Sequence, residues 1–167
     1  MARSPVTADN FARAETDRYF ARFSQGKVGV LIHHREPADA DNQEVVRDNP
    51  NVLGSLAVVD LDAGPATLVL PDAGDRFMSL MVTDEDHYTY TVYDAGPRRL
   101  TKEQVGTRYV FAAVRTLVNP NDAHDVAAVH ALQDAMRLDQ PAGPGSFEVP
   151  DWDAESQNTV RAALIEL

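Results

Sequence analysis

Residues 55–93 alternate short apolar segments with clusters of turn-forming residues. Successive side chains of a β-strand point to opposite faces, so apolar residues at every second position predict a strand with one buried face. Residues 76–83 follow this pattern, whereas residues 56–61 are apolar at both sets of positions. We therefore predict four consecutive short strands, with the strand at 56–61 in the interior of its sheet.

A helix is predicted ahead of these strands, over residues 7–23. Its apolar residues recur on one side, and Thr7 or Asp9 is suited to cap the first turn. Arg13 and Asp17 stand four positions apart, which predicts an ion pair along the helix surface.

The segments that link these elements are less clearly patterned. Residues 28–32 fit either an edge strand or a continuation of the helix, and the pattern does not decide between them. Residues 39–51 indicate a loop with one helical turn at 42–47. Residues 101–106 form a polar connector with one helical turn that Thr101 begins.

The second half of the chain is predicted to add one long strand and two helices. Residues 108–118 are rich in β-branched and aromatic types and are followed by an Asn-Pro pair, which favours a strand. Asn121 or Asp122 then caps a helix that runs to about residue 138. After a linker rich in proline and glycine, Asp153 caps a last helix.

The chain ends within the apolar stripe of this last helix. Leu167 is followed by no glycine or other helix-terminating residue. We therefore expect residues 1–167 to be a single domain that forms the N-terminal part of a longer chain.

Composition narrows the classes of function. The absence of cysteine excludes disulfides, thiolate metal sites and a cysteine nucleophile. A net charge of −11 argues against nucleic acid and anionic membranes as partners and favours a neutral or cationic ligand. Apolar runs reach only about five residues, against about twenty for a membrane span. With no signal-like apolar region at the N-terminus, we expect a soluble, cytoplasmic protein.

Three ordered segments carry a resemblance to a known family. They are NPNVLGSLAVVDL at 49–61, LPDAGDRFMSLMVTDEDHY at 70–88 and TRYVFAAVRTLVNPND at 107–122. In order and spacing they resemble the bacterial family called domain of unknown function 1254. The resemblance implies an α+β fold, mainly an antiparallel β-sandwich of immunoglobulin-like type with flanking N-terminal and C-terminal helices. It also implies a second, all-β jelly-roll domain after this one.

The resemblance implies no established reaction. Some members of the family are labelled hydrolases or carboxylesterases, without catalytic residues that transfer to this chain. The family pattern Asn-x-Asp-Thr-Leu-Tyr-Ser is altered, because Asn51, Val52 and Gly54 replace its Asp, Thr and Tyr, while Leu53 is retained. If that segment carries chemistry in relatives, this chain has lost it.

Few residues suggest catalysis. The G-x-S-x-G signature of a serine hydrolase is absent. Among the serines near apolar segments (Ser55, Ser79, Ser146), Ser79 fits a plain strand position better than the role of a nucleophile. His87 follows three acidic residues, 84–86, which could orient it as an acid or base, although a solvated turn explains it as well. Arg115 lies in an apolar strand and needs a carboxylate such as Asp60.

The remaining candidates are aromatic residues and histidines. Tyr88, Tyr90 and Tyr93 could line a ligand groove or simply pack across strands. No pair of histidines has metal-ligand spacing, so we predict neither a metal site nor a cofactor.

Two functions remain open at this point, and a third, a sugar- or lipid-binding sandwich, rests on fold analogy alone. The first is a non-catalytic assembly or ligand-binding module that associates with itself or with a second all-β domain. The second is a hydrolase acting on a small neutral ester or amide, in which His87, a serine such as Ser79, and Arg35 or Arg115 converge on one pocket.

Overall fold

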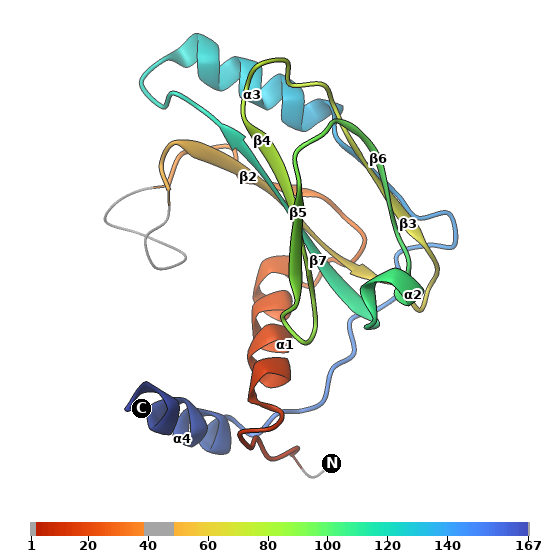
Figure 1. The fold of residues 1–167 in the computed structure, drawn as a ribbon, viewed down its shortest axis with the longest axis vertical. Coiled ribbons are helices and arrows are strands. Elements are labelled where there is room, and N and C mark those ends of the chain that lie inside the picture. The colour runs from red at the N-terminus through yellow and green to blue at the C-terminus, as the bar shows by residue number, and fades with distance from the viewer. Residues whose placement is uncertain (1–2, 39–48, 167) are drawn as a thin grey trace.

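Two antiparallel sheets and four helices make up the computed structural model, which describes residues 3–38 and 49–166 (Figure 1). The five-stranded sheet has the order β1 (Ile32–His33), β2 (Val52–Asp60), β7 (Tyr109–Leu117), β4 (Met78–Asp84), β5 (Thr89–Val92). The three-stranded sheet has the order β6 (Gly96–Leu100), β3 (Ala66–Leu70), β8 (Arg137–Asp139). The helices are α1 (Phe11–Ser24), α2 (Lys102–Val105), α3 (Ala123–Ala135) and α4 (Ala154–Ile165). The predicted α+β class, with two sheets and flanking helices, is confirmed.

The main hydrophobic core lies between the two sheets. Alternate residues of the longer strands point into it, including Leu68 of the smaller sheet and Leu80 of the larger one, both fully buried. Val59 and Val110 face each other across the β2–β7 pair within the same core. The period of two seen in the sequence therefore reflects packing of one sheet on the other.

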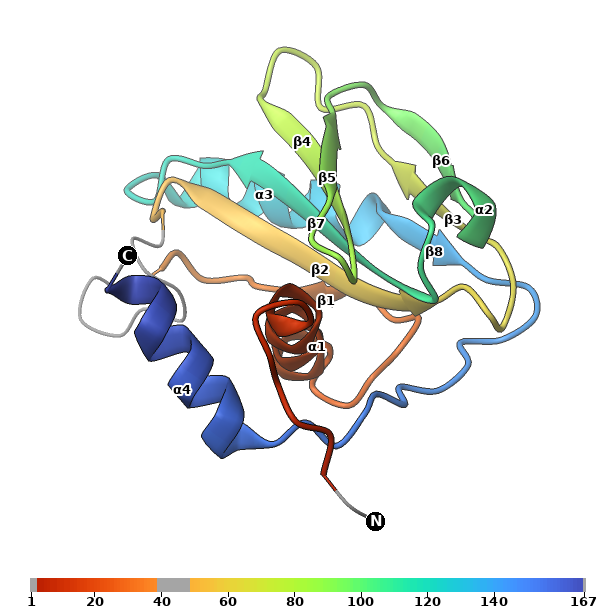
Figure 2. The ribbon, with the colours of Figure 1, turned by 60° about the horizontal axis from the view of Figure 1, so that its bottom comes forward.

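The opposite face of the five-stranded sheet is covered by α1 (Figure 2). Phe20 and Phe23 of this helix contact the ring of Phe111 on β7, with centroids 5.7 and 5.3 Å apart. Val58 of β2 is buried on this second face. Because both faces of β2 are covered, both sets of its side chains are apolar, as expected of an interior strand.

The predicted helix starts are partly correct. Thr101, Asp122 and Asp153 each accept a hydrogen bond from a backbone N–H in the first turn of the helix that follows. At α1 the N-cap position is held by Asn10, whose side chain makes no capping hydrogen bond to the helix, so the prediction of Thr7 or Asp9 was wrong.

The expected ion pair between Arg13 and Asp17 does not form. Arg13 instead contacts Glu85 and Asp86 in the turn after β4. Asp17 faces inward and accepts a hydrogen bond from Trp152. Arg13 thus pairs with carboxylates from a distant turn and not with Asp17 of its own helix. Exposed ion pairs along a helix contribute little to stability.

Two short strands were missed, and one open choice is decided. β6 begins in a segment rich in turn-forming residues. β8 occupies the end of the helix that was predicted to run to about residue 138. The undecided segment 28–32 ends in β1, a strand of two residues. The helical turn predicted at 42–47 lies outside the described residues.

The last helix packs on the first. In α4, Arg161 and Gln157 bind Glu15 of α1, and Gln157 is buried. Leu164 and Ile165 are exposed, so the apolar stripe of this helix is not buried within the described part of the chain.

Candidate functional site

The turn between β4 and β5 is built around one aspartate. The carboxylate of Asp84 accepts hydrogen bonds from the backbone N–H groups of Asp86 and Tyr88, at 2.9 and 2.8 Å. Aspartate is favoured in such turns because its short side chain satisfies nearby backbone donors. His87 occupies the left-handed position of the turn, with φ of 70°. The chain therefore reverses its direction here, and β5 follows at the edge of the five-stranded sheet.

The outer side of β5 is open. Within residues 3–38 and 49–166, no strand pairs with β5 on the side away from β4. Its four residues are TYTV, which contain neither a charge nor proline. Unpaired strand edges readily accept a further strand, and proteins usually block them with charges, proline or short length.

The other three sheet edges of the described structure are blocked in these ways. β1 is only two residues long. β6 carries Pro97 together with Arg98 and Arg99. β8 has three residues, of which Arg137 and Asp139 are charged and exposed. β5 is therefore the one unshielded sheet edge in this part of the chain.

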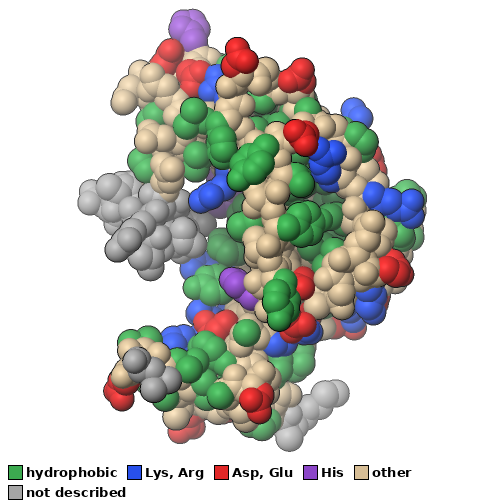
Figure 3. Space-filling model, viewed as in Figure 1, with side chains coloured by type: hydrophobic (Ala, Val, Ile, Leu, Met, Phe, Trp, Pro, Cys, Tyr) green, Lys and Arg blue, Asp and Glu red, His purple; other side chains and the backbone are tan. Residues whose placement is uncertain are grey.

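Large aromatic side chains line this edge. The exposed fractions are 78% for Tyr88, 50% for Tyr90, 64% for Tyr93 and 47% for the neighbouring Phe77. The rings of Phe77 and Tyr93 contact each other with centroids 6.0 Å apart. Figure 3 shows hydrophobic side chains one above another along β5, with acidic side chains at the lower end. We call β5 with these four residues the β5 margin.

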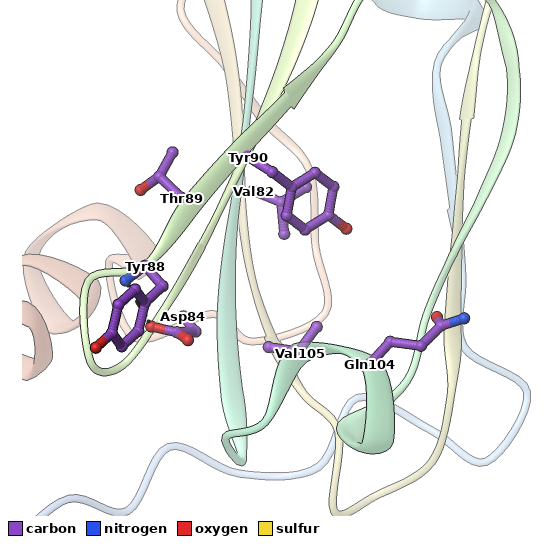
Figure 4. A pocket seen from close by; sticks show the side chains of 7 residues that line it. All are labelled: Val82, Asp84, Tyr88, Thr89, Tyr90, Gln104 and Val105. Carbon is purple, nitrogen blue, oxygen red and sulfur yellow. Dashed lines mark hydrogen bonds between the residues drawn. The ribbon is translucent and has the colours of Figure 1, made fainter.

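A small hollow opens beside the β5 margin, between the five-stranded sheet and α2. It has a volume of about 170 Å³ and is lined by Val82, Asp84, Tyr88, Thr89, Tyr90, Gln104 and Val105. Tyr90 and Val82 enter it from β5 and β4, and Gln104 and Val105 from α2 (Figure 4). Partial burial raises the pKa of Tyr90, so its phenol stays neutral at physiological pH. The hollow therefore offers aromatic rings and aliphatic side chains together with polar groups, which include the carboxyl residue Asp84 and one amide.

Acidic groups surround the turn at the start of β5. Glu85 is buried and accepts a hydrogen bond from the backbone N–H of Tyr109 at 2.8 Å. Asp86 is half exposed, and Arg13 is the cation that contacts both of these carboxylates. The turn thus carries three carboxylates, of which Glu85 and Asp86 contact Arg13, and this leaves that end of the β5 margin negative.

A second buried carboxylate lies behind the turn. Asp17 is 1% exposed, and its Oδ2 accepts a hydrogen bond from the indole of Trp152 at 2.8 Å. Its Oδ1 has no hydrogen-bond partner among the described residues. Burial, reinforced by the charge of Glu85, raises the pKa of Asp17 to about 6.

The structure does not gather the predicted catalytic residues into one pocket. His87 is exposed and its Nδ1 lies 3.1 Å from Oγ1 of Thr16. Ser79 is buried on β4, opposite Arg115 of β7 in the strand register. Five residues separate Ser79 from the end of β4, a distance of about 16 Å along the strand. Ser79 and Arg115 are therefore neighbours, and His87 lies at the other end of the sheet.

The expected pair between Asp60 and Arg115 is wrong. Asp60 binds Arg108 through two hydrogen bonds of 3.0 and 2.9 Å, and the register places Arg115 opposite Gly54. The two residues thus lie at opposite ends of the β2–β7 pair. Arg115 is exposed, so it needs no buried partner.

The two other residues named with the hydrolase hypothesis have structural contacts. Arg35 binds Asp134 and the carbonyl of His130 on α3. Ser146 lies in the segment before α4, where its N–H donates to Asp60.

A serine and a histidine do meet elsewhere. Nδ1 of His33 lies 2.8 Å from Oγ of Ser55, across the β1–β2 pair. Burial, with the charge of Arg35, lowers the pKa of His33, so its ring is neutral at pH 7. Ser55 is only 1% exposed. The sequence offered no signal for this contact, because it depends on the register of a strand whose existence was undecided.

The described residues were also compared with the requirements of a metal site and of a membrane-spanning helix. None of their groups of histidine, aspartate and glutamate is arranged to hold a metal ion. Among their helices, none combines the length and the apolar character required to cross a bilayer.

These observations define the described structure as a helix-flanked β-sandwich domain with one open sheet margin. A family model described as "Protein of unknown function (DUF1254)" matches residues 28–106, which include β1 to β6 and α2. The resemblance to this family found in the sequence is thereby confirmed.

Comparison with solved structures supports the same fold. The crystal structure of the VPA0106 protein from Vibrio parahaemolyticus, a structural genomics target, matches with a TM-score of 0.64 and 14% sequence identity. The match covers 87% of this chain and 41% of that chain, so this sequence spans less than half of that protein. At this identity the likeness concerns the fold alone. A search of proteins with curated descriptions found no match.

Proposed function

We propose that this domain is a non-catalytic module that binds a protein partner through the β5 margin. The observation that carries the proposal is the contrast between the sheet edges of the described structure. Three are shortened, charged or closed by proline, and β5 is uncharged and open. Soluble domains that remain alone normally protect such an edge, so an unprotected one favours a binding role.

The side chains of the margin support the same role. Aromatic residues supply much of the binding energy at protein interfaces because they bury a large area with few rotatable bonds. Three tyrosines and one phenylalanine lie together here and are about half exposed or more. Aromatic side chains in such a cluster are typical of the central part of an interface.

Site-specific photocrosslinking in cells that express the protein tests the proposal. A photoreactive amino acid replaces Thr91, an exposed residue in the middle of β5, and the control replaces Ala162, an exposed residue of α4. We expect a discrete covalent adduct from position 91 and none from position 162. The proposal fails if position 91 gives no adduct, or if both positions give the same adducts.

The alternative of a hydrolase acting on a small neutral ester or amide is favoured by one observation, the contact between His33 and Ser55. A neutral imidazole beside a hydroxyl is the minimum for an activated nucleophile. Hydrolysis of a nitrophenyl ester by the purified chain, and its loss in Ser55→Ala, would establish this alternative. A rate equal to that of buffer in both proteins would exclude it for that class of ester.

A further inference from the structure

We infer that the partner binds as an additional strand: an extended segment antiparallel to β5, with apolar side chains at alternate positions and basic residues at its C-terminal end. This inference rests on the proposed function, because it describes what the β5 margin binds. It depends on three separate features, which are the backbone pattern of β5, the hollow beside it and the charge at its two ends.

The backbone pattern identifies the groups available to a new strand. The N–H of Asp84 donates to the carbonyl of Tyr88 at 3.0 Å, which makes these two residues a hydrogen-bonded pair. Hydrogen-bonded and non-hydrogen-bonded pairs alternate along an antiparallel ladder. The backbone groups of Tyr90 and Val92 therefore face β4. Those of Thr89 and Thr91 face away from the sheet and remain available.

The two faces of β5 determine what the side chains of a new strand would meet. Oγ1 of Thr89 lies 3.0 Å from Oγ1 of Thr83, so these hydroxyls share the face on which α1 packs. Tyr90 pairs with Val82 and points to the other face, where the hollow lies. Every second side chain of an added strand would point to that face, and one of them would lie at the hollow. Because Val82, Val105 and the Tyr90 ring line it, an apolar side chain of moderate size suits it.

The charges specify the direction of the partner. The turn before β5 carries Asp84, Glu85 and Asp86 against the single cation Arg13. At the other end, Asp94 is 3.8 Å from Arg98, which offsets its charge. An antiparallel partner has its C-terminus beside the turn, so basic residues at that end meet the carboxylates.

The same charges disfavour a second copy of this chain as the occupant. Each copy carries a net charge of −11, and this charge opposes the close approach of two copies. A separate segment with basic residues is therefore the better complement.

Peptide binding to the full chain tests the inference. The probe is a fluorescent, capped peptide of alternating threonine and valine with two lysines at its C-terminus, and its matched control has the lysines at the N-terminus. We expect the probe to bind at least about tenfold more tightly than the control, which corresponds to about 1.4 kcal/mol. Thr91→Lys should weaken binding of the probe, and Ala162→Lys should not.

Backbone methylation of the probe tests strand addition itself. Two peptides are made, one methylated on the backbone nitrogens of the odd-numbered residues and the other on those of the even-numbered residues. In an antiparallel ladder only one of these sets of nitrogens faces β5, so only one peptide has its hydrogen bonds to β5 blocked. We expect one form to lose binding and the other to retain it. Equal binding of both forms, or of the two lysine arrangements, would overturn the inference.

The two proposals can fail independently. If position 91 crosslinks to a partner in cells and neither lysine peptide binds, the strand inference is wrong and the binding module stands. If position 91 crosslinks to a second copy of the chain, the inference is wrong about the occupant. If neither crosslinking nor peptide binding occurs, both proposals are wrong.

Discussion

Replacing Asp17 by asparagine should stabilise the protein at neutral pH. Asp17 is buried behind the turn before β5, with one oxygen bonded to Trp152 and the other without a hydrogen-bond partner in the described residues. A buried carboxylate with no cation in contact is destabilising when ionised, because it has lost its hydration. Asparagine has nearly the same shape and keeps an oxygen that accepts the indole N–H.

The size of the effect follows from the pKa of Asp17. Its value of about 6 lies above the ordinary 3.8, so the folded protein binds this proton more tightly than the unfolded chain does. The protonated form therefore stabilises the fold below about pH 4, and this contribution is lost as pH rises through about 6. The full difference would be about 3 kcal/mol at most, and the amide group of asparagine, which takes the place of the unpartnered Oδ1, reduces the expected gain of Asp17→Asn to about 1–2 kcal/mol at pH 8.

Urea unfolding at pH 4 and pH 8 measures this difference. The single tryptophan of the chain is Trp152, whose indole binds Asp17, so its fluorescence reports on the relevant region. We expect the variant to be more stable than the wild type at pH 8, with the two proteins nearly equal at pH 4. Asp151→Asn, which changes an exposed carboxylate next to the same tryptophan, should change stability by less than about 0.5 kcal/mol. A variant that is less stable at pH 8, or equally stabilised at both pH values, would refute the reasoning.

Three further outcomes can be measured by the same unfolding and activity assays. Leu80→Ala opens a cavity between the two sheets and should lower the free energy of unfolding by about 2–5 kcal/mol. Arg108→Gln leaves the carboxylate of Asp60 buried without its cation and should lower it by about 3–5 kcal/mol, whereas an effect below about 1 kcal/mol would show that solvent reaches Asp60. Ser55→Ala removes the contact with His33 and should leave ester hydrolysis at the buffer rate seen for the wild type, as expected of a non-catalytic domain.

The sequence was informative where a side chain's environment repeats along the chain. Met78, Leu80 and Val82 of β4 alternate toward the core between the sheets, and β2 is apolar on both of its buried faces, so both strands were predicted. β6 was missed because Gly96 and Pro97 have turn propensity, and this strand lies at an edge where proline is tolerated.

Pairings between distant strands were beyond the sequence. Asp60 was expected to pair with Arg115, and the cation that it binds is Arg108, seven residues earlier on the partner strand. A shift of several residues in register decides which charges meet, and residue types do not encode it strongly. The contact between His33 and Ser55 was inaccessible for the same reason.

The β5 margin was predictable only in part. Tyr88, Tyr90 and Tyr93 were recognised as candidates for a groove or for packing between strands, and their exposure shows that the described chain leaves them largely uncovered. Their significance depends on β5 being an edge strand, which is a property of the sheet order. The pattern of residues 88–93 alone does not predict which strands will lie beside them.

The arrangement of the sandwich limits where binding can occur. The central strands β2 and β7 are buried on one face by the smaller sheet and contribute to a second cluster with α1 on the other. New hydrogen bonds to the backbone are therefore possible mainly at sheet edges, and in the described residues only β5 is open, uncharged and longer than two residues. The turn that positions β5 is held from behind by Arg13, which contacts Glu85 and Asp86. This contact joins the turn to α1 and orders the margin before a partner arrives, so strand addition would cost little conformational entropy.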